Sequence, residues 1–169
     1  MRMRKAHTPI PSPPQGERRR AETWPHLSGW LEEGTHVLPV RVYYEDTDFS
    51  GVVYHASYLR FLERGRTDLL RLSGIDQSTL HAEGAGLIFA VRRMTIDFLK
   101  PARMNDVLIV ETSTEEVRGA SLVIAQAIQR GEETLLTADV RVAALTAGRP
   151  ARIPDALRTI LKPGSEEQP

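Results

Sequence analysis

The 169-residue sequence contains no cysteine, no net formal charge and no long apolar run. The absence of cysteine excludes disulfides, thiolate metal sites and a cysteine nucleophile. It also fits a reducing compartment, so we expect a cytoplasmic protein. A membrane-crossing helix requires roughly 20 consecutive apolar residues. No stretch of this sequence approaches that length, and we therefore expect no membrane span.

The charges that cancel overall are unevenly distributed along the chain. Residues 1–20 hold six basic residues and a single acidic one, which leaves an excess of acidic residues in the remainder. An acidic body argues against a nucleic-acid-binding module, because such modules normally present a basic face. Hydrophobic residues make up 41% of the chain and charged residues 26%, which is ordinary for one globular domain.

The N-terminal segment has a composition that cannot form a core. It combines basic and polar residues with four prolines, Pro9, Pro11, Pro13 and Pro14. We expect a disordered basic, proline-rich tail over residues 1–33, unless the start of the chain is mis-assigned. The globular domain is then expected over residues 34–163 and a flexible tail over 164–169. A short helical turn that docks on the domain is suggested by the spacing of Trp24, Leu27, Trp30 and Leu31.

A strand followed by an acidic loop is predicted at the start of the stretch 40–74. Val40, Val42 and Tyr44 alternate with polar residues, which is the two-residue period of a half-buried strand. Residues 45–51 then interrupt this period with acidic, small and glycine residues, which are typical of a loop.

A long helix is predicted directly after this loop. From about Ala56 to Leu72 the apolar residues recur at helical spacing, and Gly74 occupies the position where a helix commonly ends. Gly65 lies inside the helix, where glycine costs roughly 1 kcal/mol relative to alanine. We therefore expect the helix backbone to pack closely against another surface at Gly65.

The remainder of the chain alternates with a period of two and predicts four strands and a terminal helix. The strands are expected at 87–99, 107–114, 122–128 and 136–144. Residues 130–133 predict a hairpin turn, Gly148 and Pro150 are expected to end the last strand, and Pro154 is expected to be the first residue of a short helix. Successive strands joined by short connections are expected to pair antiparallel.

These elements predict an α+β domain in the order β-α-β-β-β-β plus a short C-terminal helix. One long helix against one curved antiparallel sheet buries the apolar faces of both. Such a sheet still has an open face and open edges, so we expect a homodimer or a tetramer with edge-to-edge pairing.

A local pattern in this chain resembles the hot-dog-fold thioesterases. The nearest branch is the Tol–Pal-associated acyl-CoA thioesterases, related to the 4-hydroxybenzoyl-CoA thioesterases, and the resemblance covers about residues 38–161. The pattern is Tyr44-x-x-Thr47-Asp48-x-x-Gly51-Val52-Val53-x-His55-x-x-Tyr58. The resemblance implies a long central helix wrapped by the sheet and an active site at a dimer interface. It also implies hydrolysis of an acyl-CoA or acyl-carrier-protein thioester, without a cofactor.

The resemblance also assigns roles to individual residues. Asp48 is the implied catalytic carboxylate, and the backbone N–H near His55 is the implied donor that polarises the thioester carbonyl. The His55 side chain is a further candidate for contact with substrate or water, and Tyr44 is a candidate for orienting Asp48. Further candidates for substrate contact are Gly51, Val52, Val53 and Tyr58. Coenzyme A carries phosphates, for which the candidate cations are Arg92, Arg93, Lys100, Arg103 and Arg118.

Other interpretations of the same residues stay open at this point. An aspartate before a helix is often an N-cap, but Asp48 lies several residues too early, and Ser50 or Ser57 is better placed. The spacing from Asp46 to Gly51 matches half of a calcium loop, but Ser57 stands where that loop requires a glutamate, so we expect no metal. A hot-dog hydratase or dehydratase and a non-catalytic acyl-binding or envelope-associated module are the alternative functions.

Overall fold

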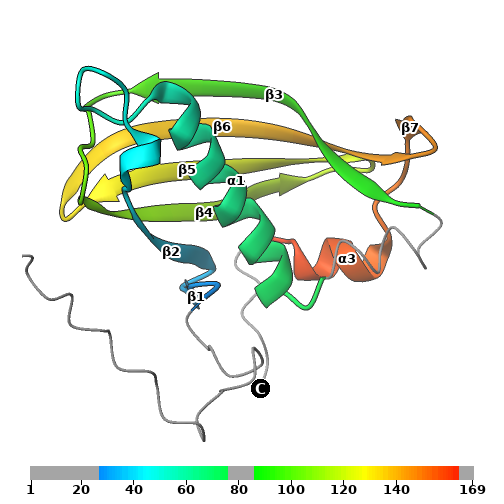
Figure 1. The fold of residues 1–169 in the computed structure, drawn as a ribbon. Coiled ribbons are helices and arrows are strands. Elements are labelled where there is room, and N and C mark those ends of the chain that lie inside the picture. The colour runs from blue at the N-terminus through cyan, green and yellow to red at the C-terminus, as the bar shows by residue number, and fades with distance from the viewer. Residues whose placement is uncertain (1–26, 76–85, 164–169) are drawn as a thin grey trace, which may run out of the picture.

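The computed structural model describes residues 27–75 and 86–163. One long helix, α1 (His55–Leu72), lies across one face of a seven-stranded antiparallel sheet (Figure 1). The predicted α+β architecture is therefore confirmed. Residues 1–26, including Trp24, and residues 164–169 lie outside the described residues, so the tails predicted there stay predictions.

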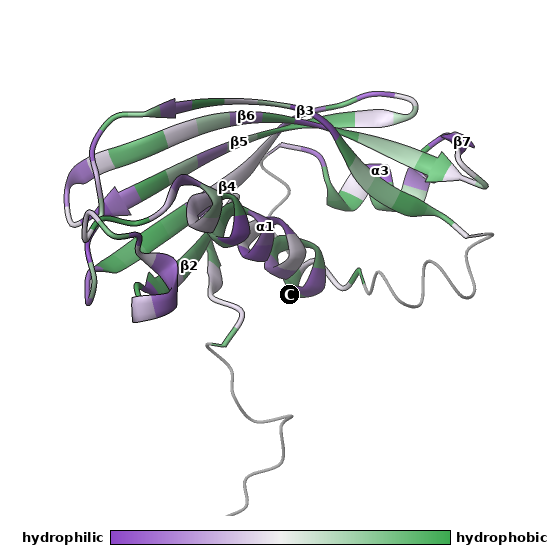
Figure 2. Cartoon of the chain, turned by 45° about the horizontal axis from the view of Figure 1, so that its top comes forward, coloured by the Kyte–Doolittle hydropathy of each residue, from purple (hydrophilic) through white to green (hydrophobic). Residues whose placement is uncertain are grey.

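The sheet contains all four of the long strands predicted after the helix. Its strand order is β1-β2-β4-β5-β6-β3, with β7 paired to β6, and every pairing is antiparallel. Along the strands, hydrophobic and hydrophilic residues alternate (Figure 2). The strands are β1 (Trp30–Glu32), β2 (Thr35–Arg41), β3 (Ile88–Phe98), β4 (Val107–Val117), β5 (Ser121–Arg130), β6 (Glu133–Thr146) and β7 (Arg149–Pro150).

The position of β3 differs from the prediction that successive strands pair. β3 does not pair with β4, which follows it in the chain. It pairs with β6 at the edge of the sheet, while β4 pairs with β2 and β5. Helix α1 lies between β2 and β3 in the chain, so β3 is not tied to β2 by a short turn and joins the sheet at the edge opposite β1. Residues 99–106 then return along one end of the sheet to β4 (Figure 1).

The start of the ordered sheet also differs from the prediction. Trp30 and Leu31 belong to strand β1, which forms a hairpin with β2, and not to a helical turn. Since β1 lies inside the segment expected to be tail, the boundary at residue 33 is too late. The hydrogen bonds of β2 explain the correction, because they extend the sheet by one short strand irrespective of side-chain spacing.

The end of the domain shows two smaller corrections. Pro150 does not simply end a strand, because it pairs with Leu145 in the short strand β7 after a turn at Ala147 and Gly148. Pro154 is the N-cap of the terminal helix α3 (Asp155–Ile160) and not its first residue. The predicted hairpin between β5 and β6 is confirmed.

The core lies between α1 and the face of the sheet that it covers. Buried side chains from α1, including Phe61 and Leu62, pack with those of β4, β5 and β6. Gly65 permits this packing, because a Cβ atom at that position would lie 2.7 Å from the Thr112 side-chain oxygen and 3.0 Å from a Val110 methyl group. The close approach predicted from Gly65 is therefore confirmed.

Candidate active site

The strand before α1 ends earlier than predicted, and turns replace its last residues. β2 ends at Arg41, and a 3₁₀ helix follows at Tyr44–Asp46. Tyr44 is therefore not part of the strand, and 80% of its surface is exposed. The reason is that the main chain turns after the buried Val42. No hydrogen bond between the Tyr44 side chain and Asp48 is present among the described residues, so its orienting role stays a prediction.

The two aspartates of the acidic loop have different surroundings. Asp46 is buried, and its carboxylate accepts a hydrogen bond from the Tyr43 backbone N–H at 2.9 Å. The Asp46 carbonyl accepts a second bond, at 2.8 Å, from the backbone N–H of Tyr54, immediately before α1. Asp46 therefore fixes the geometry of the loop. Within residues 27–75 and 86–163, no three His, Cys, Asp or Glu residues group closely enough to hold a metal.

Asp48 opens a tight turn and has an exposed side chain. Its carbonyl accepts a hydrogen bond from Gly51 N–H, and its own N–H donates to Val52 O, each at 3.0 Å. Gly51 has φ of +77°, a conformation that favours glycine. The Asp48 carboxylate accepts hydrogen bonds from the Ser50 hydroxyl at 2.5 Å and the Ser50 backbone N–H at 2.8 Å. These two bonds, the hydroxyl first, lower the pKa of Asp48 below its ordinary value.

The N-terminus of α1 is left open by the chain. Its N-cap is Tyr54, whose side chain makes no capping bond. None of the side chains considered as caps, those of Asp48, Ser50 and Ser57, therefore serves in that role. Ser57 lies inside the first turn, where its N–H donates to Tyr54 O at 2.8 Å. The backbone N–H groups of His55 and Ala56 have no acceptor in the described part of the chain. Unpaired donors at the positive end of a helix dipole stabilise negative charge.

Residues 99–106 form the wall behind this loop. Val53 N–H donates to Ala102 O at 2.8 Å, and Val52 forms a β-bridge with Arg103. The hydroxyl of the buried Tyr58 accepts a hydrogen bond from Ala102 N–H at 2.7 Å, and burial raises the pKa of Tyr58. Val53 and Tyr58, predicted to contact substrate, are thus core residues that position the loop. Gly51 is exposed and Val52 half-buried.

The comparisons with known proteins identify the family. The sequence profile described as the Thioesterase superfamily matches residues 50–137, more than half of the chain. The chain belongs to the thioesterase superfamily. The predicted hot-dog fold and the predicted class of enzyme, a thioester hydrolase, are thereby confirmed. The match begins two residues after Asp48 and therefore does not include that residue.

The thioesterase is similar to curated bacterial enzymes over most of their length. It is 52% identical over 98 residues to the acyl-CoA thioester hydrolase YbgC of Escherichia coli O157:H7, covering 58% of this chain and 72% of that protein. It is 46% identical over 112 residues to the acyl-CoA thioesterase YbgC of Haemophilus influenzae, covering 66% and 82%. A probable thioesterase from Bartonella henselae of known structure is 44% identical, with a TM-score of 0.69, covering 71% and 99%.

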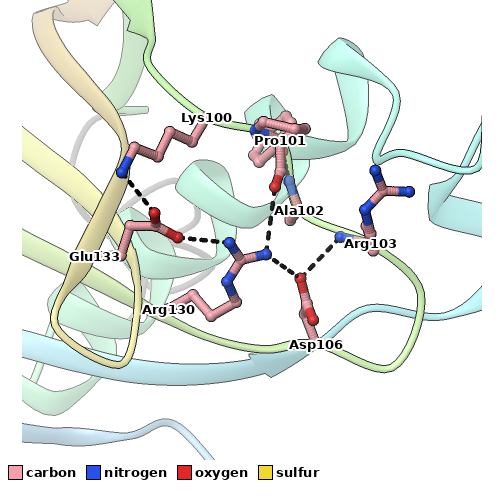
Figure 3. A network of polar contacts seen from close by, with 8 residues as sticks. Lys100, Pro101, Ala102, Arg103, Asp106, Arg130 and Glu133 are labelled. Atoms are coloured by element: carbon pink, nitrogen blue, oxygen red, sulfur yellow. Dashed lines mark hydrogen bonds and ion pairs between the residues drawn. The ribbon is translucent and has the colours of Figure 1, made fainter.

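An ion-pair network holds the wall formed by residues 99–106 in place (Figure 3). Arg130 donates to Asp106 at 2.8 Å and to Glu133 at 2.5 Å, and Lys100 donates to Glu133 at 2.6 Å. Burial acts to raise the pKa of Asp106, but the Arg103 backbone N–H and the Arg130 guanidinium lower it below its ordinary value. The network joins the start of β4 to the β5–β6 hairpin and thereby fixes residues 99–106.

The structure does not bring the five candidate phosphate-binding cations together. Lys100 is paired with Glu133. Arg118 is paired with Glu116 and follows the end of β4, whereas Asp106 precedes its start. Arg92 and Arg93 are exposed at a bulge within β3. Arg103 lies beside the Asp48 loop through its bridge with Val52, and its side chain extends away from the network (Figure 3). Of the five, Arg103 is the best placed.

A small cavity of about 60 Å³, lined mainly by apolar side chains together with Glu63 and Arg66, lies under the C-terminal half of α1. Its lining includes Leu69 and Leu70 of α1 and Phe89 and Val91 of the edge strand β3. Sequence reasoning missed this cavity, because it depends on how closely α1 and β3 approach across the sheet.

In the part of the chain that the structure describes, no helix is long and apolar enough to span a membrane.

Proposed function

We propose that the protein hydrolyses acyl-CoA thioesters with Asp48 as the nucleophile or general base. One observation carries this proposal: an exposed carboxylate of lowered pKa lies in a hydrogen-bonded turn seven residues before an uncapped helix N-terminus. The names of the YbgC relatives, which act on acyl-CoA, support coenzyme A as the thiol. An acyl-carrier protein stays a second form of the same substrate. The presence of the implied catalytic carboxylate, Asp48, argues against a non-catalytic acyl-binding module.

The proposed reaction uses both halves of this site. The thioester carbonyl oxygen accepts hydrogen bonds from the free N–H groups of His55 and Ala56, which stabilise the negative charge that develops there. With Asp48 as general base, the carboxylate takes a proton from water, and the water oxygen attacks the carbonyl carbon. The C–S bond then breaks, and the sulfur leaves as a thiolate that takes up a proton. The products are a carboxylic acid and a free thiol.

The proposal includes a dimer formed through β3. Its outer edge has no partner strand among the described residues, and Ile88, Val91 and Phe98 are about half exposed along it. Antiparallel pairing of two β3 strands places the Ile88 end of one protomer beside the Phe98 end of the other. The Phe98 ring contacts the Tyr58 ring near the Asp48 loop, with centroids 5.8 Å apart. The apolar cavity of one protomer then lies near the Asp48 loop of its partner.

The motif around Asp48 further leads us to place the protein in the Tol–Pal-associated branch. The absence of cysteine leads us to place it in the cytoplasm. Purification of the tagged protein from fractionated cells tests the location. Recovery in the membrane or periplasmic fraction would contradict it.

The substitution Asp48→Asn tests the chemistry, because it keeps the size of the side chain and removes its charge. Loss of a general base typically costs 10²–10⁴-fold, so we expect kcat to fall at least about 100-fold on the best substrate of an acyl-CoA panel assayed for free thiol. Asp46→Asn is the matched control: its amide oxygen still accepts from Tyr43, and it should cost far less. An Asp48→Asn enzyme that keeps more than about a tenth of wild-type kcat would disprove the mechanism.

A further inference from the structure

Phe49 is an exposed aromatic residue with no structural role in its own turn. Its fractional exposure is 108%, higher than that of any other large hydrophobic residue in the described part of the chain. The turn is held by backbone bonds of Asp48 and Gly51 and by the Ser50 side chain. None of these bonds involves the phenyl ring, so any residue at this position can form the same turn.

The ring is also chemically unlike the exposed aromatics around it. Tyr43, Tyr44 and Tyr54 are exposed as well, but each carries a hydroxyl that water can satisfy. Phe49 has no polar atom, so its exposure leaves apolar surface in water without any compensating hydrogen bond. A partner that covers the ring gains the free energy of burying that surface.

We propose that Phe49 is a specificity-determining residue that packs against the acyl group of the thioester and favours longer apolar acyl groups. This proposal rests on the proposed function. Consecutive Cα atoms lie about 3.8 Å apart, so a thioester whose carbonyl carbon reaches the Asp48 carboxylate passes within reach of the neighbouring ring. The acyl chain is the apolar part of that substrate, whereas the coenzyme A arm consists largely of amides and phosphates. Apolar packing therefore selects the acyl side.

The test compares Phe49→Ala with wild type on acetyl-CoA and octanoyl-CoA. We expect kcat/KM for octanoyl-CoA to fall about tenfold, the equivalent of about 1.4 kcal/mol, mainly through KM, with a much smaller change for acetyl-CoA. Phe49→Leu, which keeps an apolar side chain, should recover most of the loss. Trp30→Ala is the matched control for removal of an exposed aromatic away from the loop and should leave the acyl preference unchanged.

Two outcomes would overturn the proposal while leaving the function intact. The first is a loss that does not follow the acyl group: it is equal on both acyl groups or it changes with the thiol, coenzyme A or N-acetylcysteamine. The second is a shift of Phe49→Ala from dimer to monomer in sedimentation velocity at micromolar concentration, which would assign the ring to the subunit contact. If wild type releases no thiol, or Asp48→Asn is as active as wild type, the proposed function fails, and this inference fails with it.

Discussion

The two ends of helix α1 are finished in opposite ways. At the C-terminus the chain satisfies its own carbonyl groups: Gly74 N–H donates to Arg71 O at 3.1 Å, and Ile75 N–H donates to Leu70 O at 2.9 Å. These two bonds form a Schellman motif. At the N-terminus no side chain caps the helix, and the N–H groups of His55 and Ala56 stay without acceptors in the described chain.

This difference indicates that the C-terminus of α1 contributes mainly to stability, whereas its N-terminus is available for function. A closed terminus contributes to the free energy of folding, because its polar groups are paired within the chain. An open terminus contributes less, but it leaves donors available to a ligand. The open end of α1 is also the end that follows the ionised Asp48. We infer that the helix is anchored by its middle and its C-terminus so that its N-terminus is free for the thioester.

Gly74→Ala breaks the closed end and has the largest expected effect on stability. Gly74 has φ of +71°, and a Cβ atom there meets nothing within 4 Å, so the cost is that of the backbone conformation alone. We expect the free energy of unfolding to fall by about 1 kcal/mol, measured by urea denaturation. At temperatures where the protein stays folded, kcat should equal that of wild type. A loss of kcat without a loss of stability would show that the two ends are not independent.

Ser50→Ala changes the loop before the open end of α1 and has a smaller expected effect. The Ser50 hydroxyl is the largest contributor to the lowered pKa of Asp48, so its removal should raise that pKa toward the ordinary value. Since the reaction requires the carboxylate, kcat/KM should begin to fall at a higher pH on acidification than in wild type. At neutral pH both enzymes have an ionised Asp48. A pH profile with an unchanged acidic limb would show that Asp48 is not the group that titrates.

The local patterns of the sequence predicted most of the elements but not their arrangement. The strands, the length of α1 and the contact at Gly65 follow from periodicity and from the cost of a helical glycine. The position of β3 beside β6 did not follow, since it is a pairing between strands distant in the sequence that local patterns do not specify.

Side-chain pairs distant in the sequence were also missed. Arg66 lies buried on α1 and donates to Gln126 on β5 at 2.7 Å, sixty residues away. Gln126 in turn donates to the Leu62 carbonyl and to the Thr112 hydroxyl, each at 2.9 Å. Each of these polar residues occupies an inward-facing position, where a periodicity argument expects an apolar side chain. Only the folded structure shows that their hydrogen bonds are satisfied by one another.

The sequence pattern named the candidate residues of the site, but it did not predict the position of every side chain. Asp48 and the N–H of His55 were predicted from the resemblance; Asp48 is exposed and the His55 N–H has no acceptor among the described residues, and their catalytic roles stay predictions. Tyr44 was expected in the strand and is instead exposed beyond it. Tyr58 matched the motif as a candidate for substrate contact, but its hydroxyl is used to hold Ala102.

In the proposed mechanism the backbone N–H of His55 stabilises the reacting carbonyl, and the substitution His55→Pro removes that donor. Proline is well tolerated at the first position of a helix, and Tyr54, at φ −65° and ψ 136°, already has the extended conformation required before proline. The substitution therefore removes the N–H with little effect on folding. His55→Ala, which keeps the N–H and removes the side chain, is the control.

Comparison of kcat for these two variants, with melting temperatures measured alongside, gives the decisive result. Loss of one oxyanion donor costs about 10²–10³-fold, so we expect His55→Pro to lose at least about 100-fold in kcat while His55→Ala retains much more activity. Equal activity of a folded His55→Pro enzyme and of His55→Ala would contradict the claim.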